Sequence, residues 1–120
     1  LLGEKIDNHG SDVWLVNTGW TGGPAGVGQR MKLAYTRKMV SAVLSGELEG
    51  CELRLDPSFN LRVPTEIDGV PDSVLNPRET WQDKEAYDAQ AMKLAIMFKE
   101  NFEQFKDGIS EEVYESGPAA

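Results

Sequence analysis

One stretch of the chain has no acidic residue and carries the side chains best suited to bind an anion. Residues 13–46 lack Asp and Glu, and their cations are Arg30, Lys32, Arg37 and Lys38. Five of the twelve glycines also lie there, within ten residues: Gly19, Gly22, Gly23, Gly26 and Gly28. Glycine exposes the backbone amides, and exposed amides beside cations suit a phosphate group. These residues predict a site for an anionic, phosphorylated ligand near residues 19–37; a solvated face on which lysines and arginines cluster is the alternative.

The other residue types that carry chemistry do not form the pattern of a second site. His9 is the only histidine and Cys51 the only cysteine, so we expect no zinc centre, which needs about four nitrogen or sulfur ligands. The sequence has no Gly-x-Ser-x-Gly for a serine nucleophile. Gly23 and Gly28 have the spacing of a phosphate-binding loop, but no Lys-Ser/Thr pair follows them. The residues alone therefore predict an anion site and no particular reaction.

A strand and a helix are predicted to position this site. Residues 13–16 form a continuous β-branched and aromatic run, which predicts a short buried strand. A glycine-rich loop over residues 17–28 follows. Apolar residues then recur at helical spacing, which predicts a helix over residues 29–44 that stops before Gly46. Two cations would fall in its first turn, where the helix dipole disfavours them unless an anion or nearby carboxylates compensate.

The second half of the chain is predicted to form a hairpin and a long helix. Residues 51–55 and 59–63 alternate apolar and polar, as half-buried strands do, with a turn between them. Residues 83–106 predict the longest helix, capped by Thr80 or Asp83. Its apolar stripe, which we interpret as core, is Tyr87, Ala91, Leu94, Phe98, Phe102 and Phe105. Short helices are expected at the start of the chain, through Ile6, and over residues 111–115.

Several segments, in order along the chain, resemble the C-terminal portion of the ATP-dependent phosphoenolpyruvate carboxykinase family. The run VWLVNTGWTGGP over residues 13–24 carries the likeness first. Residues 26–31 resemble the family's Gly-x-Gly-Lys-Arg segment, with Gln29 in place of Lys, and residues 36–37 its Thr-Arg pair. Later matches lie at residues 59–65 and 75–81. The likeness covers more than a hundred residues, which is far more specific than a lone glycine loop.

The resemblance implies a fold, an activity and a place for this chain within them. The implied fold class is α/β (mixed α+β), with residues 1–120 as the C-terminal part of a mononucleotide-binding domain in a longer polypeptide. The implied reaction converts oxaloacetate and ATP to phosphoenolpyruvate, ADP and carbon dioxide, the committed step of gluconeogenesis. The resemblance implies ATP contacts by Arg30, Met31 and Thr36. It places the catalytic residues, and the ligands of a divalent metal such as Mg²⁺ or Mn²⁺, outside this segment.

Composition limits the partners and the compartment. The net charge of −8 over 120 residues argues against broad binding of nucleic acid or anionic membranes. The longest apolar runs are far shorter than the roughly 20 residues that span a bilayer. A single cysteine fits a reducing compartment, so we expect a cytoplasmic protein. The expected partners are oxaloacetate, ATP and the remainder of the parent polypeptide.

Two other hypotheses compete with a segment of the enzyme. The chain could be a stand-alone nucleotide-binding or regulatory module without catalysis. It could also have a purely structural role, with the acid-free stretch docking an acidic partner. The resemblance favours the enzyme segment, because several of its motifs occur in the right order.

Overall fold

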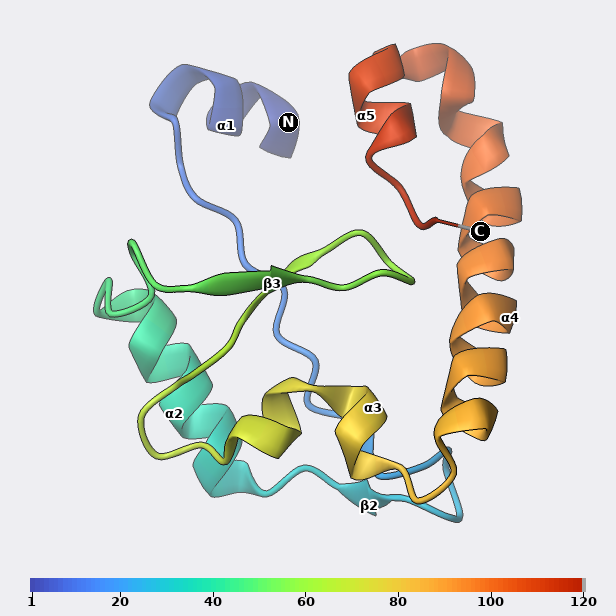
Figure 1. The fold of residues 1–120 in the computed structure, drawn as a ribbon. Helices are drawn as coiled ribbons and strands as arrows, with labels where there is room; N and C mark the ends of the chain where they lie inside the picture. Colours follow the sequence, from blue (N-terminus) through green and yellow to red (C-terminus); the bar gives the residue numbers. More distant parts are fainter. Residues whose placement is uncertain (120) are drawn as a thin grey trace.

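The computed structural model describes residues 1–119 and combines helices with two small antiparallel sheets (Figure 1). In chain order the elements are α1 (Leu2–His9), β1 (Trp20–Thr21), β2 (Gln29–Arg30), α2 (Leu33–Leu44), β3 (Leu53–Leu55), β4 (Arg62–Pro64), η1 (Asp72–Leu75), α3 (Pro77–Thr80), α4 (Lys84–Phe102), η2 (Glu103–Gly108) and α5 (Glu111–Glu115). Helices α2 and α4 lie on opposite sides of the molecule, with the β3–β4 hairpin and α3 between them (Figure 1). The mixed α/β class is therefore confirmed.

The first helix is confirmed, but the strand predicted after it is wrong. Helix α1 runs three residues beyond Ile6 and stops at Gly10, which takes the left-handed conformation (φ 60°) and donates its N–H to the Ile6 carbonyl. Residues 13–16 form no strand, and Leu15 is 80% exposed. A strand is stabilised by a ladder of hydrogen bonds to a neighbour, and no described residue pairs with this segment. Only Trp14 in it packs against the core.

The glycine-rich loop is the turn of a hairpin, and this changes the start of the following helix. Strands β1 and β2 pair antiparallel, with Trp20 opposite Arg30 and Thr21 opposite Gln29. The predicted helix start at residue 29 is therefore wrong, because the hairpin ladder uses the backbone of these residues. Helix α2 begins only at Leu33, and it ends at Leu44, as predicted.

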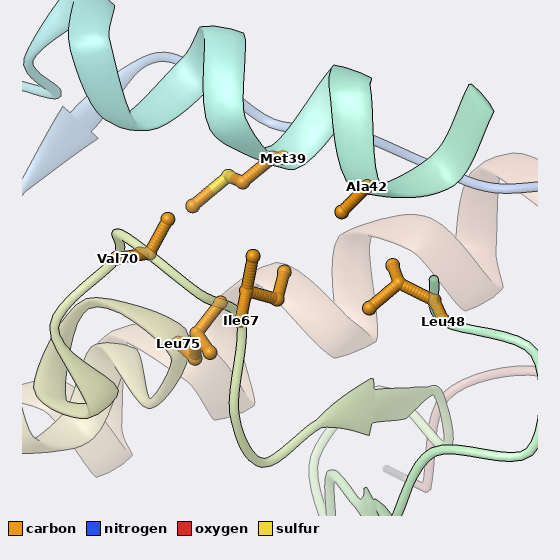
Figure 2. Packing of buried hydrophobic residues seen from close by; sticks show 6 residues of the cluster. All are labelled: Met39, Ala42, Leu48, Ile67, Val70 and Leu75. Carbon is orange, nitrogen blue, oxygen red and sulfur yellow. The ribbon is translucent and has the colours of Figure 1, made fainter. Parts of the chain in front are cut away.

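The core lies between α2 and the segments that follow the second hairpin. Met39 and Ala42 of α2 point toward the side chains of the irregular stretch after β4 (Figure 2). The buried cluster consists of Met39, Ala42, Leu48, Ile67, Val70 and Leu75. Met31, Tyr35 and Trp14 pack against it from outside. The residues that frame the predicted anion site are thus anchored on this cluster.

The predicted second hairpin is confirmed, with shorter strands than expected. Strands β3 and β4 pair antiparallel, with Arg54 opposite Val63. The buried carboxylate of Asp56 shapes the turn, because it accepts hydrogen bonds from the N–H groups of Ser58 and Phe59, both at 2.9 Å. Arg54 extends from β3 and donates from Nη2 to the Leu75 carbonyl at 2.9 Å. The hairpin is thereby tied to η1.

The long helix is confirmed from its cap to Phe102, where it tightens into the 3₁₀ turn η2. Asp83 is its N-cap and accepts from the Ala86 N–H at 3.0 Å. Helix α5 occurs where it was predicted, capped by Ser110.

The interpretation of the α4 stripe as core is correct only in part. Ala91 is buried, but Phe98 and Phe105 are about half exposed, at 50% and 52%. The physical reason is that α5, the residues after it and the turn of the β3–β4 hairpin cover this part of the helix only in part. Phe98 meets only the edge of Phe59, with ring centroids 6.3 Å apart.

The described chain is more open than a self-contained domain of its size. Its accessible surface is 9122 Å², whereas about 6,500 Å² is typical of a folded monomer of this mass. Its radius of gyration is 15.8 Å, against about 14 Å for a compact domain of this length. Large apolar side chains such as Leu15, Val27 and Leu44 contribute to the excess.

Candidate functional site

The three residues expected to contact ATP lie close in sequence but in different elements. Arg30 is the last residue of β2 and is exposed. Met31 follows it and is half-buried, and Thr36 lies half-buried near the start of α2. The hairpin thus presents Arg30, while the helix presents Thr36. The sequence pattern predicted that both side chains lie on one helix, and this prediction is wrong.

Arg30 is placed by its strand partner. Trp20 lies directly opposite it in the β1–β2 ladder, and cross-strand partners project their side chains from the same face. The Arg30 guanidinium carbon lies 6.0 Å from the centre of the Trp20 ring. This distance is at the outer limit of a cation–π contact.

Met31 joins the hairpin to the core. Its N–H donates to the Gly19 carbonyl at 3.0 Å, which continues the hairpin by one residue. Its side chain packs against the buried cluster. Met31 therefore positions the start of α2 through both its backbone hydrogen bond and its packed side chain.

The start of α2 is positively charged and lacks a side-chain cap. Lys32 is its N-cap residue and makes no capping hydrogen bond, and the first turn holds no acidic residue. The free amides of a helix start carry a partial positive charge that attracts anions. Lys32 extends over the Tyr35 ring, with its Nζ 5.6 Å from the ring centre.

The cations of residues 13–46 have no acidic partner in the described part of the chain. The ion pairs within 4.0 Å there are Arg78–Asp88, Lys84–Glu79 and Lys106–Glu103, all on or near α3, α4 and η2. Nearby carboxylates were the alternative way to offset the unfavourable charges at the helix start. Since no ion pair brings a carboxylate of residues 1–119 within 4.0 Å of these cations, the site can lower its electrostatic energy by taking up an anion.

A cavity of about 820 Å³ lies beside the glycine loop rather than beside the cations. Its walls include Gly22 and Val27 from the loop and Thr80, Trp81 and Asp83 from the junction of α3 with α4. Its lining does not include Arg30, Met31 or Thr36. The structure therefore separates the glycines from the cations, which the sequence grouped together.

A single hydrogen bond fastens the glycine loop to the α3–α4 junction. The Gly22 N–H donates to the Thr80 hydroxyl at 3.1 Å, across 58 positions of sequence. Thr80 in turn donates to the Pro77 carbonyl at 2.6 Å. Sequence reasoning considered Thr80 only as a helix cap, and no spacing signal links it to residue 22.

The groups with clearly shifted pKa values lie away from the candidate site. Burial, with a smaller contribution from Asp56, raises the pKa of the Tyr87 phenol. The hydrogen bond from Arg78 lowers the pKa of the Asp88 carboxyl. The hydrogen bond to Glu103 raises the pKa of the Tyr114 phenol. These shifts follow from packing along α3, α4 and α5 and mark no acid–base pair near α2.

The acidic, histidine and cysteine side chains of the described residues do not cluster as metal ligands. Within residues 1–119, no three His, Cys, Asp or Glu side chains gather in a way that could hold a metal ion. This segment does not fit a metal centre, and the role proposed below involves no metal contact.

Among residues 1–119, no helix has both the length and the apolar composition that a membrane span requires.

The fold and the site together define a class of protein segment. It is a mixed α/β segment that presents a cationic, uncapped helix start and leaves much apolar surface uncovered. The chain belongs to the phosphoenolpyruvate carboxykinase family, since the model of that family matches residues 1–73. The resemblance seen in the sequence is thereby confirmed.

Individual relatives are similar over nearly the whole chain. A Moorella thermoacetica protein named phosphoenolpyruvate carboxykinase (ATP) 2 is 61% identical over 98% of this chain. Proteins named phosphoenolpyruvate carboxykinase (ATP) from Thermus thermophilus and Brucella suis are 58% and 52% identical over 98% and 99% of it. In each case the match covers 22% of the relative. The chain thus spans about a fifth of the length of these relatives.

Proposed function

We propose that this chain is the C-terminal part of the nucleotide-binding domain of an ATP-dependent phosphoenolpyruvate carboxykinase and supplies contacts to ATP. The whole enzyme would convert oxaloacetate and ATP to phosphoenolpyruvate, ADP and carbon dioxide. The observation that carries the proposal is the start of α2, which has no side-chain cap, has no acid nearby in sequence and has its N-cap residue two positions after Arg30. An anionic ligand such as a nucleotide fits that charge.

Each candidate residue has a role that its chemistry allows. Arg30 would neutralise phosphate charge through its guanidinium, whose planar donors can form two hydrogen bonds to one phosphate. Thr36 would hydrogen-bond the nucleotide through its hydroxyl. Met31 would offer a backbone or apolar contact to the base. Decarboxylation and phosphoryl transfer would use residues outside this chain, so the segment positions one substrate.

The remainder of the parent polypeptide is the proposed partner of the exposed apolar surface. The accessible area exceeds that of a self-contained fold, and the relatives named above are about five times longer than their matched part. Burial of exposed side chains such as Leu15, Leu44 and Phe98 against further chain would remove part of this excess. We also propose that the enzyme serves gluconeogenesis in the cytoplasm.

Steady-state kinetics of the full-length protein test the ATP contact. Loss of a charged hydrogen bond costs about 1.5–3 kcal/mol, so Arg30→Ala should raise the KM for ATP by about ten-fold or more. The KM for oxaloacetate should change little. Arg62→Ala, which removes an exposed arginine from β4, is the matched control and should leave both constants unchanged. An unchanged KM for ATP in Arg30→Ala would contradict the proposal.

A further inference from the structure

We infer that Trp20 is a positioning residue that orients the Arg30 guanidinium toward the nucleotide. This inference rests on the proposed function, because it requires Arg30 to contact ATP. Trp20 is a large aromatic residue with 52% of its surface exposed. The group within reach of its ring is the Arg30 guanidinium, 6.0 Å from the ring centre.

The hairpin fixes the Trp20–Arg30 pair at both ends. The two residues are direct partners in the ladder, so their side chains leave the same face of the ribbon. Next to Trp20, the Gly19 carbonyl accepts from the Met31 N–H at 3.0 Å. On the other side of β1, Gly22 is fastened to Thr80. Backbone hydrogen bonds and the Gly22–Thr80 contact therefore fix the register of the pair, independently of the Trp20 and Arg30 side chains.

A ring in this place acts on Arg30 by restricting its motion. An exposed arginine loses side-chain entropy when it binds a ligand in one orientation. A tryptophan face is the strongest aromatic partner for a cation. Because the Arg30 guanidinium already lies near the Trp20 ring in the free protein, its side chain has fewer orientations to lose when the ligand binds. Binding therefore becomes tighter without a new contact to the ligand. The expected contribution is about two- to five-fold in affinity.

Steady-state kinetics of the full-length enzyme test this inference. Trp20→Leu should raise the KM for ATP about two- to five-fold and leave kcat and the KM for oxaloacetate within two-fold. Trp20→Phe keeps an aromatic face and should recover most of the loss. Val27→Ala, at an exposed position of the same hairpin loop, is the control for general disturbance of the loop and should match the wild type.

A double variant separates this inference from the proposed function. In an Arg30→Ala background, Trp20→Leu should cause no further change in the KM for ATP, because its effect passes through Arg30. A further two- to five-fold rise in that background would overturn the inference and indicate that Trp20 contacts the nucleotide or supports the fold. If Arg30→Ala raises the KM but Trp20→Leu alone does not, the inference fails and the ATP contact stands. If Arg30→Ala has no effect, the ATP contact itself fails.

Discussion

Gly28 is the residue at which the glycine loop closes on itself. The Gly28 N–H donates to the Pro24 carbonyl at 2.9 Å. A Cβ at this position would overlap the Gly23 carbonyl and lie only 2.7 Å from the Thr21 oxygen. Backbone atoms cannot move aside as the end of a flexible side chain can. The glycine is therefore required by close approach of the backbone, which is a different reason from ligand access.

The substitution Gly28→Ala should destabilise the hairpin and weaken ATP binding. Forcing a methyl group into a packed site costs about 1–3 kcal/mol. Gly108→Ala is the control, because Gly108 has no left-handed φ and a Cβ there would meet nothing within 4 Å. In thermal unfolding of the full-length protein, Gly28→Ala should lower the midpoint more than Gly108→Ala does. Equal midpoints would mean that the loop relaxes away from the overlap.

At the scale of single residues, sequence reasoning found the cations but missed their partners. Arg30 and Lys32 stand out because residues 13–46 contain no acid. The stacking of Arg30 on Trp20 depends on strand register, which a glycine-rich segment does not reveal in its pattern. The contact of Gly22 with Thr80 depends on the tertiary fold. Local patterns contain no information about either contact.

The junction of α3 with α4 is held by an exposed ion pair. Arg78 donates to both carboxylate oxygens of Asp88, from Nε at 2.8 Å and from Nη2 at 3.1 Å. The pair joins one helix to the first turns of the next. Because both side chains are well exposed, water and salt screen much of the attraction.

The pH dependence of this junction follows from the lowered pKa of Asp88. A carboxyl whose pKa is lower in the folded than in the unfolded protein stabilises the fold fully above the unfolded value, near 3.9. That contribution declines as the pH falls through the folded pKa. Carboxyl NMR titration should find the pKa of Asp88 below 3.9 and restored toward it in Arg78→Gln. Identical titration curves in the two proteins would show that the pair does not persist in solution.

At the scale of elements, helix ends were predictable where a local signal sets them. Asp83 caps α4 and Gly10 terminates α1, and both residue types mark such positions in sequence. The start of α2 was not predictable, because Gln29 and Arg30 pair with Thr21 and Trp20 in a hairpin despite their helical pattern. Residues 13–16 have the composition of a strand, but strand formation requires a partner that the described chain does not supply. Strand pairing decides both cases: its presence overrides the helical pattern of Gln29 and Arg30, and its absence overrides the strand propensity of residues 13–16.

For the whole molecule, the exposed apolar surface has a measurable consequence. We expect the isolated 120-residue chain to bind a hydrophobic dye such as ANS strongly, because side chains such as Leu15 and Leu44 remain uncovered. The full-length protein should bind several-fold less dye per mole of this segment. Dye fluorescence at matched molar concentrations measures the difference. Weak dye binding by the isolated chain, with a sharp thermal transition, would show that it folds without the rest of the polypeptide.

The bond between Gly22 and Thr80 has a mechanical consequence for the loop. Without such a hydrogen bond, a glycine-rich hairpin loop would be free to change its angle relative to the rest of the fold. Here the bond links any tilt of the loop to the corner where α3 meets α4, and so to the start of α4, which lies beside the loop (Figure 1). A ligand that moves the hairpin on binding would therefore displace the start of α4 as well.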